Sequence, residues 1–177
     1  KILNKKIVKV NTFYDGIIND DKNEFIDVLT NNIIIDVERY GKYLVFILKD
    51  NHVVISHLRM EGKYHIRNSN DEINKHEHVI FTFEDNTDLR YHDTRKFGRM
   101  NLVLKKDIDS VEGVKKQGIE PIDPKLSKEY LYDNFKKRRL PMKTLLLDQT
   151  IISGLGNIYA EEVLFAAKIN PLKVGSD

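Results

Sequence analysis

The sequence contains no cysteine and no tryptophan, and its 177 residues include only 4 prolines. Without cysteine, the chain forms no disulfide and offers no thiolate nucleophile and no cysteine ligand for zinc or an iron–sulfur cluster. Its longest apolar run, residues 44–48, is far shorter than the roughly 20 residues that a membrane-spanning helix needs. No signal peptide opens the chain. The sequence therefore predicts a cytoplasmic protein without a membrane partner.

The chain also has little net charge. Its 29 lysine and arginine residues against 27 aspartate and glutamate residues leave a formal charge of +2. This balance does not by itself indicate nucleic-acid binding, so any such site must rest on local clusters. A content of 41% hydrophobic and 32% charged residues is typical of globular proteins, and the length fits one domain or two small ones. Because the chain starts at Lys1 and not at a methionine, we expect it to lack its natural beginning.

The first part of the sequence has the pattern of β-strands. From about residue 7 to residue 105, short apolar runs alternate with turn-forming residues. These runs predict strands at residues 33–35, 43–48, 53–60, 79–83, 89–93 and 102–104. Six strands and one helix predict two packed sheets.

Turns and one helix separate these strands. Asp50-Asn51 and Asp85-Asn86 predict hairpin turns because both residue types favour tight corners. A stripe of apolar residues predicts a helix over residues 22–29, with Asn19 or Asp20 as its cap.

The later part of the sequence has a helical pattern. Two prolines within residues 118–124 prevent a continuous helix there. Ser127 predicts the cap of a helix that runs to about Arg139, Pro141 predicts the first turn of a second helix, and Asn157 begins a third.

The third helix contains apolar residues at helical spacing, Tyr159, Val163, Ala166 and Ala167, which predict its buried face. The change of pattern predicts an α+β protein. We assign a β-sandwich domain to residues 1–105, a linker to residues 106–126 and an incomplete helical domain to residues 127–177.

A glycine-rich segment lies at the start of the third helix. At residues 154–157, Gly-Leu-Gly-Asn would present free backbone N–H groups and the positive end of the helix dipole, which favour a phosphate. Asn157 either donates its amide to a phosphate or simply caps the helix in a tight turn. Five cations precede this turn, Lys136, Lys137, Arg138, Arg139 and Lys143. They either neutralise a nucleic-acid backbone or form a solvated helix end.

The loop at residues 93–99 places Phe97 between cations and beside a glycine. An exposed phenylalanine flanked by arginines suits a wedge that enters a stack of bases. The alternative is that Phe97 packs in the core while the cations face water.

Other basic residues have two readings as well. His76-Glu77-His78 resembles part of a metal site, but no further ligands at suitable spacing complete it, so we expect hydrogen bonds to phosphate or carboxylate. On a strand, His57 and Arg59 would point to one face and Met60 to the other, in the core. Lys42 is either a surface cation or a group that positions DNA and relays a proton.

Six strings of this sequence, taken in order, resemble the bacterial formamidopyrimidine-DNA glycosylase family. They are Tyr40-Gly41-Lys42-Tyr43-Leu44, His57-Leu58-Arg59-Met60-Glu61-Gly62, Lys75-His76-Glu77-His78-Val79, Asp93-Thr94-Arg95-Lys96-Phe97-Gly98, Gly118-Ile119-Glu120-Pro121 and Gly154-Leu155-Gly156-Asn157-Ile158-Tyr159-Ala160. The ordered set extends along essentially the whole chain. The resemblance implies that the helical part is a helix-two-turn-helix module.

The resemblance also implies an enzyme of base-excision repair. Such enzymes flip an oxidised purine, 8-oxoguanine or a formamidopyrimidine, out of duplex DNA, cleave its glycosidic bond and nick the strand as AP lyases by β- and δ-elimination. The loop Arg95-Lys96-Phe97 favours this branch over the endonuclease VIII-type relatives that prefer oxidised pyrimidines. We expect a monomer that acts on double-stranded DNA in the bacterial nucleoid.

The resemblance assigns roles to individual positions. Lys42 matches the lysine that donates a proton in β-elimination. Met60, Arg95 and Phe97 match residues that fill the space left by the flipped base and contact the orphaned base. Altogether we predict nine DNA-binding residues: His57, Arg59, Met60, His76, Arg95, Phe97, Arg138, Lys143 and Asn157.

Two parts of the family pattern are missing. The family's nucleophile is an N-terminal proline followed by a glutamate, and Lys1 aligns after the family's first helix, so its amine is not a substitute. The family's C-terminal zinc finger, with four cysteines and the arginine used in δ-elimination, is also absent. We therefore expect a truncated core without a cofactor of its own, which binds DNA weakly and is inactive, while zinc belongs to the missing finger.

Two alternatives remain at this point. One is a non-catalytic module that binds duplex DNA through the loop at residues 93–99. The other is an unrelated enzyme with a small-anion site at Gly154.

Overall fold

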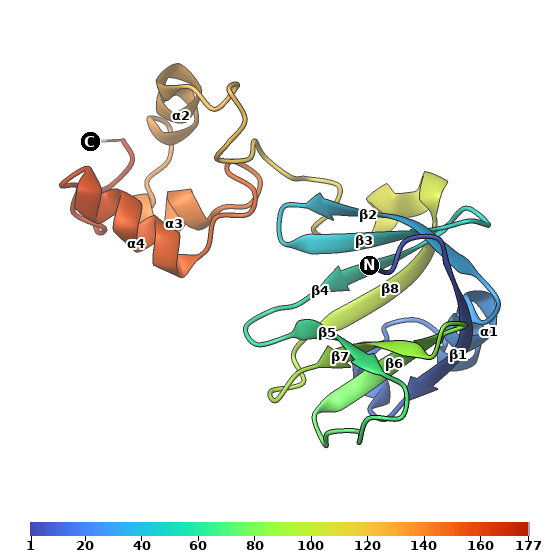
Figure 1. Cartoon of the computed structure of the whole chain (residues 1–177). Coiled ribbons are helices and arrows are strands. Elements are labelled where there is room, and N and C mark those ends of the chain that lie inside the picture. Colours follow the sequence, from blue (N-terminus) through green and yellow to red (C-terminus); the bar gives the residue numbers. More distant parts are fainter. Residues whose placement is uncertain (177) are drawn as a thin grey trace. The chain divides into compact units, whose positions relative to one another are not determined.

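The computed structural model describes residues 1–176, which form two compact units divided after Val111. The first unit contains eight strands, which are β1 Lys5–Thr12, β2 Ile33–Tyr40, β3 Tyr43–Leu48, β4 His52–His57, β5 Lys63–Asn68, β6 Glu77–Phe83, β7 Thr87–His92 and β8 Arg99–Leu104. It also contains α1 Lys22–Leu29 and the short 3₁₀ helices η1 Asp15–Ile17 and η2 Lys105–Ser110. The second unit contains α2 Lys128–Phe135, α3 Met142–Leu147 and α4 Asn157–Ala166 (Figure 1).

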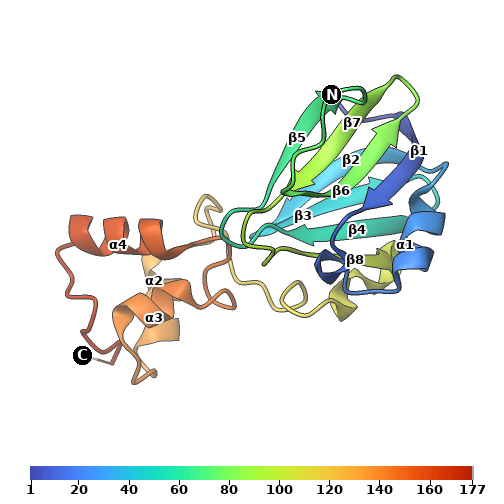
Figure 2. The same ribbon diagram turned by 90° about the horizontal axis from the view of Figure 1, so that it is seen from below.

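The strands pair in the order β5-β7-β6-β1-β2-β3-β4-β8. Figures 1 and 2 show them in two layers, with β2, β3, β4 and β8 in one layer and β5, β6 and β7 in the other. Strand β1 joins the layers, because its first residues pair with β2 and the rest pair with β6. This arrangement confirms the predicted α+β fold with a β-sandwich in its first part.

Strand β1 was not predicted, and a β-bulge explains why. The register of β1 against β6 shifts between Ile7 and Lys9. As a result, the buried residues Ile7 and Val10 are three positions apart, which breaks the two-residue alternation expected of a strand.

Two other strands differ from the prediction. Strand β5 was missed because it lies at the edge of the sheet and its side chains are largely exposed and polar. Strand β4 ends at His57 and does not continue to Met60. Arg59 has a left-handed backbone, with φ of 55°, and a strand cannot continue through that conformation.

Both predicted hairpin turns are confirmed. Asn51 joins β3 to β4 with φ of 71°, and Asn86 joins β6 to β7 with φ of 58°. Asparagine tolerates this left-handed conformation better than most residues. The cap of α1 was predicted wrongly: Asp21 accepts hydrogen bonds from the N–H groups of Asn23 and Glu24. Asp20 accepts a hydrogen bond from the N–H of Leu102 instead, at 2.6 Å.

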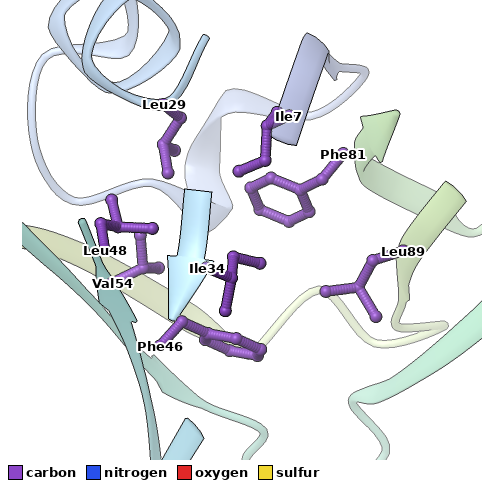
Figure 3. A pocket seen from close by; sticks show the side chains of 8 residues that line it. All are labelled: Ile7, Leu29, Ile34, Phe46, Leu48, Val54, Phe81 and Leu89. Atoms are coloured by element: carbon purple, nitrogen blue, oxygen red, sulfur yellow. The ribbon is translucent and has the colours of Figure 1, made fainter. Parts of the chain in front are cut away.

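The core of the first unit lies between the two layers and beneath α1. Eight apolar side chains surround a small cavity of about 10 Å³ (Figure 3), namely Ile7, Leu29, Ile34, Phe46, Leu48, Val54, Phe81 and Leu89. A buried water needs polar partners as well as space. The cavity is therefore a packing defect and not a ligand site.

The second unit has its own core, which includes Phe135, Leu145 and Leu164. Ser127 caps α2 as predicted, since its hydroxyl accepts a hydrogen bond from the N–H of Tyr130. Helix α2 ends at Phe135, earlier than expected, and Pro141 immediately precedes α3.

The predicted buried face of α4 is wrong. Tyr159 and Val163 are 69% and 48% exposed, whereas Ala160 and Leu164 are buried. The buried pair also has a four-residue spacing, so it satisfies the same helical period one position further along the chain.

The expected linker at residues 106–126 is divided between the units. Its first residues form η2 in the first unit. Its later residues pack within the second unit, where Ile119 pairs with Ile152 and the N–H of Gly118 donates to the carbonyl of Gln149 at 2.8 Å. Within residues 1–176, no helix combines the length and apolar character needed to cross a bilayer.

Candidate nucleic-acid interface

The loop between β7 and β8 is held by Asp93, whose side chain is buried. One carboxylate oxygen accepts the N–H of Arg95 at 3.0 Å. The other accepts the N–H of Gly98 at 2.9 Å and the hydroxyl of Tyr91 at 3.3 Å. The carbonyl of Asp93 accepts a hydrogen bond from Nε2 of His78 at 2.8 Å. The ends of the loop are therefore fixed to the sandwich.

The charge of Asp93 is part of this arrangement. Burial alone would raise the pKa of Asp93, but the N–H groups of Gly98 and Arg95 and the Tyr91 hydroxyl outweigh it and hold the pKa below its ordinary value. Gly98 is required sterically, because a Cβ atom there would lie 1.6 Å from the Tyr91 hydroxyl oxygen.

Three exposed side chains form a cluster at this loop, which we call the wedge: Met60, Arg95 and Phe97. Phe97 is 47% exposed and Met60 is 70% exposed. The guanidinium of Arg95 lies over the Phe97 ring and donates to the sulfur of Met60 at 3.2 Å. The core placements considered for Phe97 and Met60 are therefore wrong.

A second loop, at residues 58–62, brings Met60 to the wedge. The N–H of Arg59 donates to Nδ1 of His57 at 2.9 Å, and the N–H of Gly62 donates to the carbonyl of Leu58 at 3.0 Å. Glu61 accepts a hydrogen bond from the hydroxyl of Thr94, which ties this loop to the loop at residues 93–98.

His57 and Lys42 lie next to this loop. Burial, followed by the positive charges of Arg59 and Lys42, lowers the pKa of His57 to about 4. The ring is therefore neutral near pH 7. Because Nδ1 accepts the N–H of Arg59, the ring hydrogen resides on Nε2, which is available as a donor.

Burial also lowers the pKa of Lys42. Within residues 1–176 we find no carboxylate at ion-pair distance from its ammonium group. Lys42 lies at the turn between β2 and β3, next to Tyr43, which is the partner of His57 in the β3–β4 ladder. A partly desolvated lysine without an ion pair gives up its proton more readily than a surface lysine.

His76 lies at the end of a segment held by Arg90, which is 1% exposed. The guanidinium uses all five of its N–H groups, on carboxylate oxygens of Asp88 and Glu77 and on the carbonyls of Asn68, Asp71 and Glu72. Because Glu77 is committed to Arg90 and His78 to Asp93, the sequence His76-Glu77-His78 is not a ligand set. Among residues 1–176, no cluster of three or more such side chains is arranged to hold a metal ion.

In the second unit, α4 begins at Asn157 and Gly156 occupies the cap position without a side-chain cap. The cap role considered for Asn157 is therefore wrong, and its side chain is exposed. The preceding turn is held by Gln149, whose amide accepts the N–H of Gly154 at 3.0 Å and donates to the carbonyl of Leu155 at 3.0 Å.

No neighbouring atom among residues 1–176 requires a glycine at position 156. Its φ of −113° suits any residue, and a Cβ atom there would meet nothing within 4 Å. Gly118 is the opposite case, because its Cβ would lie 2.2 Å from the backbone of Ile151. The lack of a side chain at Gly156 is thus suited to a partner that approaches from outside.

The two predicted DNA-binding cations of the second unit are engaged in ion pairs. Arg138 donates to Asp148 at 2.9 Å, and Lys143 pairs with Glu161. The Arg138 side chain is 39% exposed, and only one of its N–H groups is used in this bond. The remaining groups can bind a phosphate without breaking the pair.

The structure thus places Lys42, His57, Arg59 and the wedge in the first unit, where the charge of Lys42 acts on His57 and the loop after His57 carries Arg59 and Met60. The second unit carries Arg138, Lys143 and Asn157. The residues that hold the loops, above all Asp93, Glu61 and Arg90, were not predicted. Only for Asp93 was there a signal, since an aspartate that precedes a short polar loop often accepts hydrogen bonds from the following N–H groups.

Comparison with known protein families identifies a related domain in each part of the chain. Residues 1–100 match the model of the formamidopyrimidine-DNA glycosylase N-terminal domain. Residues 117–177 match that of the formamidopyrimidine-DNA glycosylase H2TH domain. The chain belongs to the formamidopyrimidine-DNA glycosylase family. The resemblance seen in the sequence is therefore confirmed.

Members of this family in lactobacilli are close relatives. The formamidopyrimidine-DNA glycosylase of Lactobacillus acidophilus is 47% identical over 175 residues, which are 99% of this chain and 63% of that protein. The one of Ligilactobacillus salivarius is 48% identical over 170 residues, or 96% of this chain and 62% of that protein. The chain thus spans somewhat less than two thirds of these relatives.

Solved structures of the family have the same fold. The Lactococcus lactis enzyme in complex with a FAPY-dG-containing DNA superposes with a TM-score of 0.94 at 34% identity, covering 100% of this chain and 66% of that one. Its complex with an abasic-site DNA gives a TM-score of 0.94 at 34% identity, covering 100% and 65%.

Proposed function

We propose that this protein is a DNA glycosylase of base-excision repair, with AP lyase activity, that removes oxidised purines from duplex DNA. The observation that carries this proposal is the wedge, in which an exposed phenylalanine on a loop fixed by Asp93 packs against a guanidinium that donates in turn to a thioether. An exposed ring in this setting gains contacts by entering a base stack, where it offsets part of the energy needed to unstack a base. The substrate lies in the nucleoid of the cell.

In this proposal, each part of the first unit has a separate task. The wedge fills the space left by the flipped nucleotide, and Arg95 presents its N–H groups to the orphaned base. Neutral His57 donates from Nε2 to a backbone phosphate, and Arg59 adds a positive charge next to it. Lys42, whose pKa is lowered by burial, supplies the proton for β-elimination.

The second unit contributes contacts with the DNA backbone. The first N–H groups of α4 and the amide of Asn157 bind one phosphate, and Gly156 allows it to approach closely. Arg138 and Lys143 bind neighbouring phosphates. These contacts are independent of sequence and weaken as salt rises.

Zinc plays no part in the steps derived from this chain. The sequence has no cysteine, and residues 1–176 offer no metal-binding cluster. The residues present therefore do not fit the zinc site that the family carries in its finger, and we assign no step to a metal.

Borohydride trapping tests the proposal. The complete gene product is incubated with a duplex that contains 8-oxoguanine, and with a matched undamaged duplex as control. We expect a covalent complex only with the damaged duplex, because a Schiff base forms there and is reduced. If the complete product binds both duplexes and forms no covalent complex, the non-catalytic module is correct instead.

A second arm examines Lys42. In the complete product, Lys42→Gln should retain base removal but reduce strand cleavage. On a gel, heated samples report base removal and unheated samples report strand cleavage. Equal loss of both steps would contradict the role proposed for Lys42.

A further inference from the structure

Three imidazole rings lie together next to the loop that carries the wedge. His92 ends β7, His65 lies in β5, and His76 immediately precedes β6. The ring centroids of His65 and His92 are 5.8 Å apart, and those of His76 and His92 are 5.6 Å apart. His92 therefore links the other two rings, and we call the three the histidine trio.

The surroundings of the trio are positive. Lys63 lies opposite His92 in the β5–β7 ladder, and Glu77 lies opposite it in the β6–β7 ladder. Glu77 is the one carboxylate among the charged groups that act on His92, and it is bound to Arg90 at 3.0 Å. The trio thus has no carboxylate of its own to neutralise it among residues 1–176.

The central ring also lacks a hydrogen-bond partner. Within residues 1–176, Nδ1 of His92 is shielded from solvent and forms no hydrogen bond. Burial, and then the charges of Lys63, His65 and His76, lower the pKa of His92. An unpaired buried nitrogen is unfavourable, so His92 is not in its best hydrogen-bonding arrangement in the unbound chain.

The chemistry of the site favours an anion. Lys63 repels a metal ion, and the trio is not arranged to hold one. A phosphate accepts N–H groups from several imidazoles and supplies the negative charge that the surroundings lack. His92 directly precedes Asp93, which fixes the loop at residues 93–98. A phosphate bound here lies at the end of β7, where the proposed DNA-contacting loop begins.

We propose that the histidine trio and Lys63 form a subsite for one backbone phosphate of the bound duplex, and that binding there is coupled to proton uptake by His92. The nature of the ligand rests on the proposed function. Burial and the neighbouring positive charge lower the pKa of His92, so this ring is largely neutral near pH 7. A phosphate reverses that effect, so affinity rises as the pH falls.

The test measures duplex affinity of this chain by fluorescence anisotropy between about pH 7.5 and about pH 6, at constant ionic strength. Coupling to about one proton predicts roughly tenfold tighter binding at the lower pH. The variant His65→Asn/His92→Asn keeps polar side chains that do not titrate, and it should lose most of this pH dependence. His52→Gln is the matched control, because His52 pairs with Asp50 and lies on β4, which is not a neighbour of β5, β6 or β7, and it should keep the wild-type dependence.

A second measurement does not depend on the variants. NMR titration of the imidazole C–H groups of the wild-type chain should show that an added undamaged duplex raises the pKa of His92. An unchanged pKa, or equal pH dependence of binding in wild type and the double variant, overturns the subsite. Failure of the proposed function gives a different result, since the complete product would then form no covalent complex with damaged DNA although the pH-coupled binding is retained.

Discussion

The guanidinium carbon of Arg95 lies 4.7 Å from the centroid of the Phe97 ring, and the same guanidinium donates to the sulfur of Met60. Three side chains from two loops are thereby held in one cluster at the surface. Ordering side chains before binding reduces the entropy lost on binding. The wedge is thus arranged before it acts, and its parts can be tested separately.

Phe97→Ala should affect DNA more than folding. Because the ring is 47% exposed, the free energy of unfolding should change by about 0.5 kcal/mol or less. In the complete gene product, 2-aminopurine fluorescence should report less base unstacking, while affinity for undamaged duplex changes little. Phe83→Ala is the contrasting variant, since that ring is buried in the core and its loss should cost about 3–5 kcal/mol. Normal lesion processing by Phe97→Ala would rule out the wedge.

Asp93→Asn should loosen the wedge loop. An amide nitrogen replaces one of the two oxygens that accept N–H groups, so we expect the free energy of unfolding to fall by about 1–3 kcal/mol. The pKa of Asp93 is lowered by folding, so its contribution is present above the ordinary aspartate pKa and is lost as the pH falls through the lower folded value. Urea unfolding at several acidic pH values should therefore show a weaker pH dependence in the variant.

Asp27→Asn is the control for this experiment, because Asp27 is exposed on α1. If both variants unfold alike at every pH, Asp93 does not hold the loop.

His57 should remain neutral well below the ordinary histidine range. Its pKa of about 4 predicts that NMR signals of the imidazole show the Nε2–H tautomer down to about pH 5. Lys42→Gln should raise this pKa only part of the way, since burial is the larger cause and the charge of Lys42 a smaller one. A His57 midpoint near its ordinary value in the wild-type chain would contradict this environment.

Gly156→Ala should separate binding from stability. A methyl group meets nothing in the chain, and the entropic gain from replacing glycine is offset by the poor capping of a helix by alanine, so the free energy of unfolding should change by about 0.5 kcal/mol or less. Duplex affinity should nevertheless fall, because the methyl group occupies the space proposed for a phosphate. Gly118→Ala should instead lower the melting temperature, since its methyl group clashes with backbone. Unchanged affinity in Gly156→Ala would move the phosphate away from α4.

Arg138→Ala should weaken binding to damaged and undamaged duplexes alike. The loss of one phosphate contact should reduce the slope of log affinity against log salt by about 1. Lys128→Ala is the comparison, because its side chain is 92% exposed and it lies outside the proposed contacts. A slope equal to that of wild type would mean that Arg138 serves only its ion pair with Asp148.

The sequence predicted those elements whose signal is local. Turn asparagines, the cap at Ser127 and the order of the family strings were all readable from adjacent residues. Strand β1 was missed because a bulge disturbs its alternation, and β5 because an edge strand with polar side chains lacks an apolar pattern. The buried face of α4 was misplaced because two sets of apolar residues share one period, and only tertiary packing selects between them.

The same distinction holds for the site. Exposure of Phe97 was one of two alternatives that the sequence left open, and the backbone conformation of Arg59 at the end of β4 was not foreseen. The hydrogen bond from His78 to the carbonyl of Asp93 and the contacts among the histidine trio join residues from different strands. Such contacts depend on the register of the sheet, which the sequence does not display.

The bonding of Arg90 limits how the segment between β5 and β6 can evolve. Three of the five groups that Arg90 binds are backbone carbonyls, which every amino acid possesses. Residues of the segment can therefore be exchanged with little effect, whereas an insertion or deletion would displace the carbonyls from a rigid planar fork. A lysine could not replace Arg90, because it has three N–H groups for five acceptors. Among related chains, this segment should therefore keep a constant length while its amino-acid composition varies.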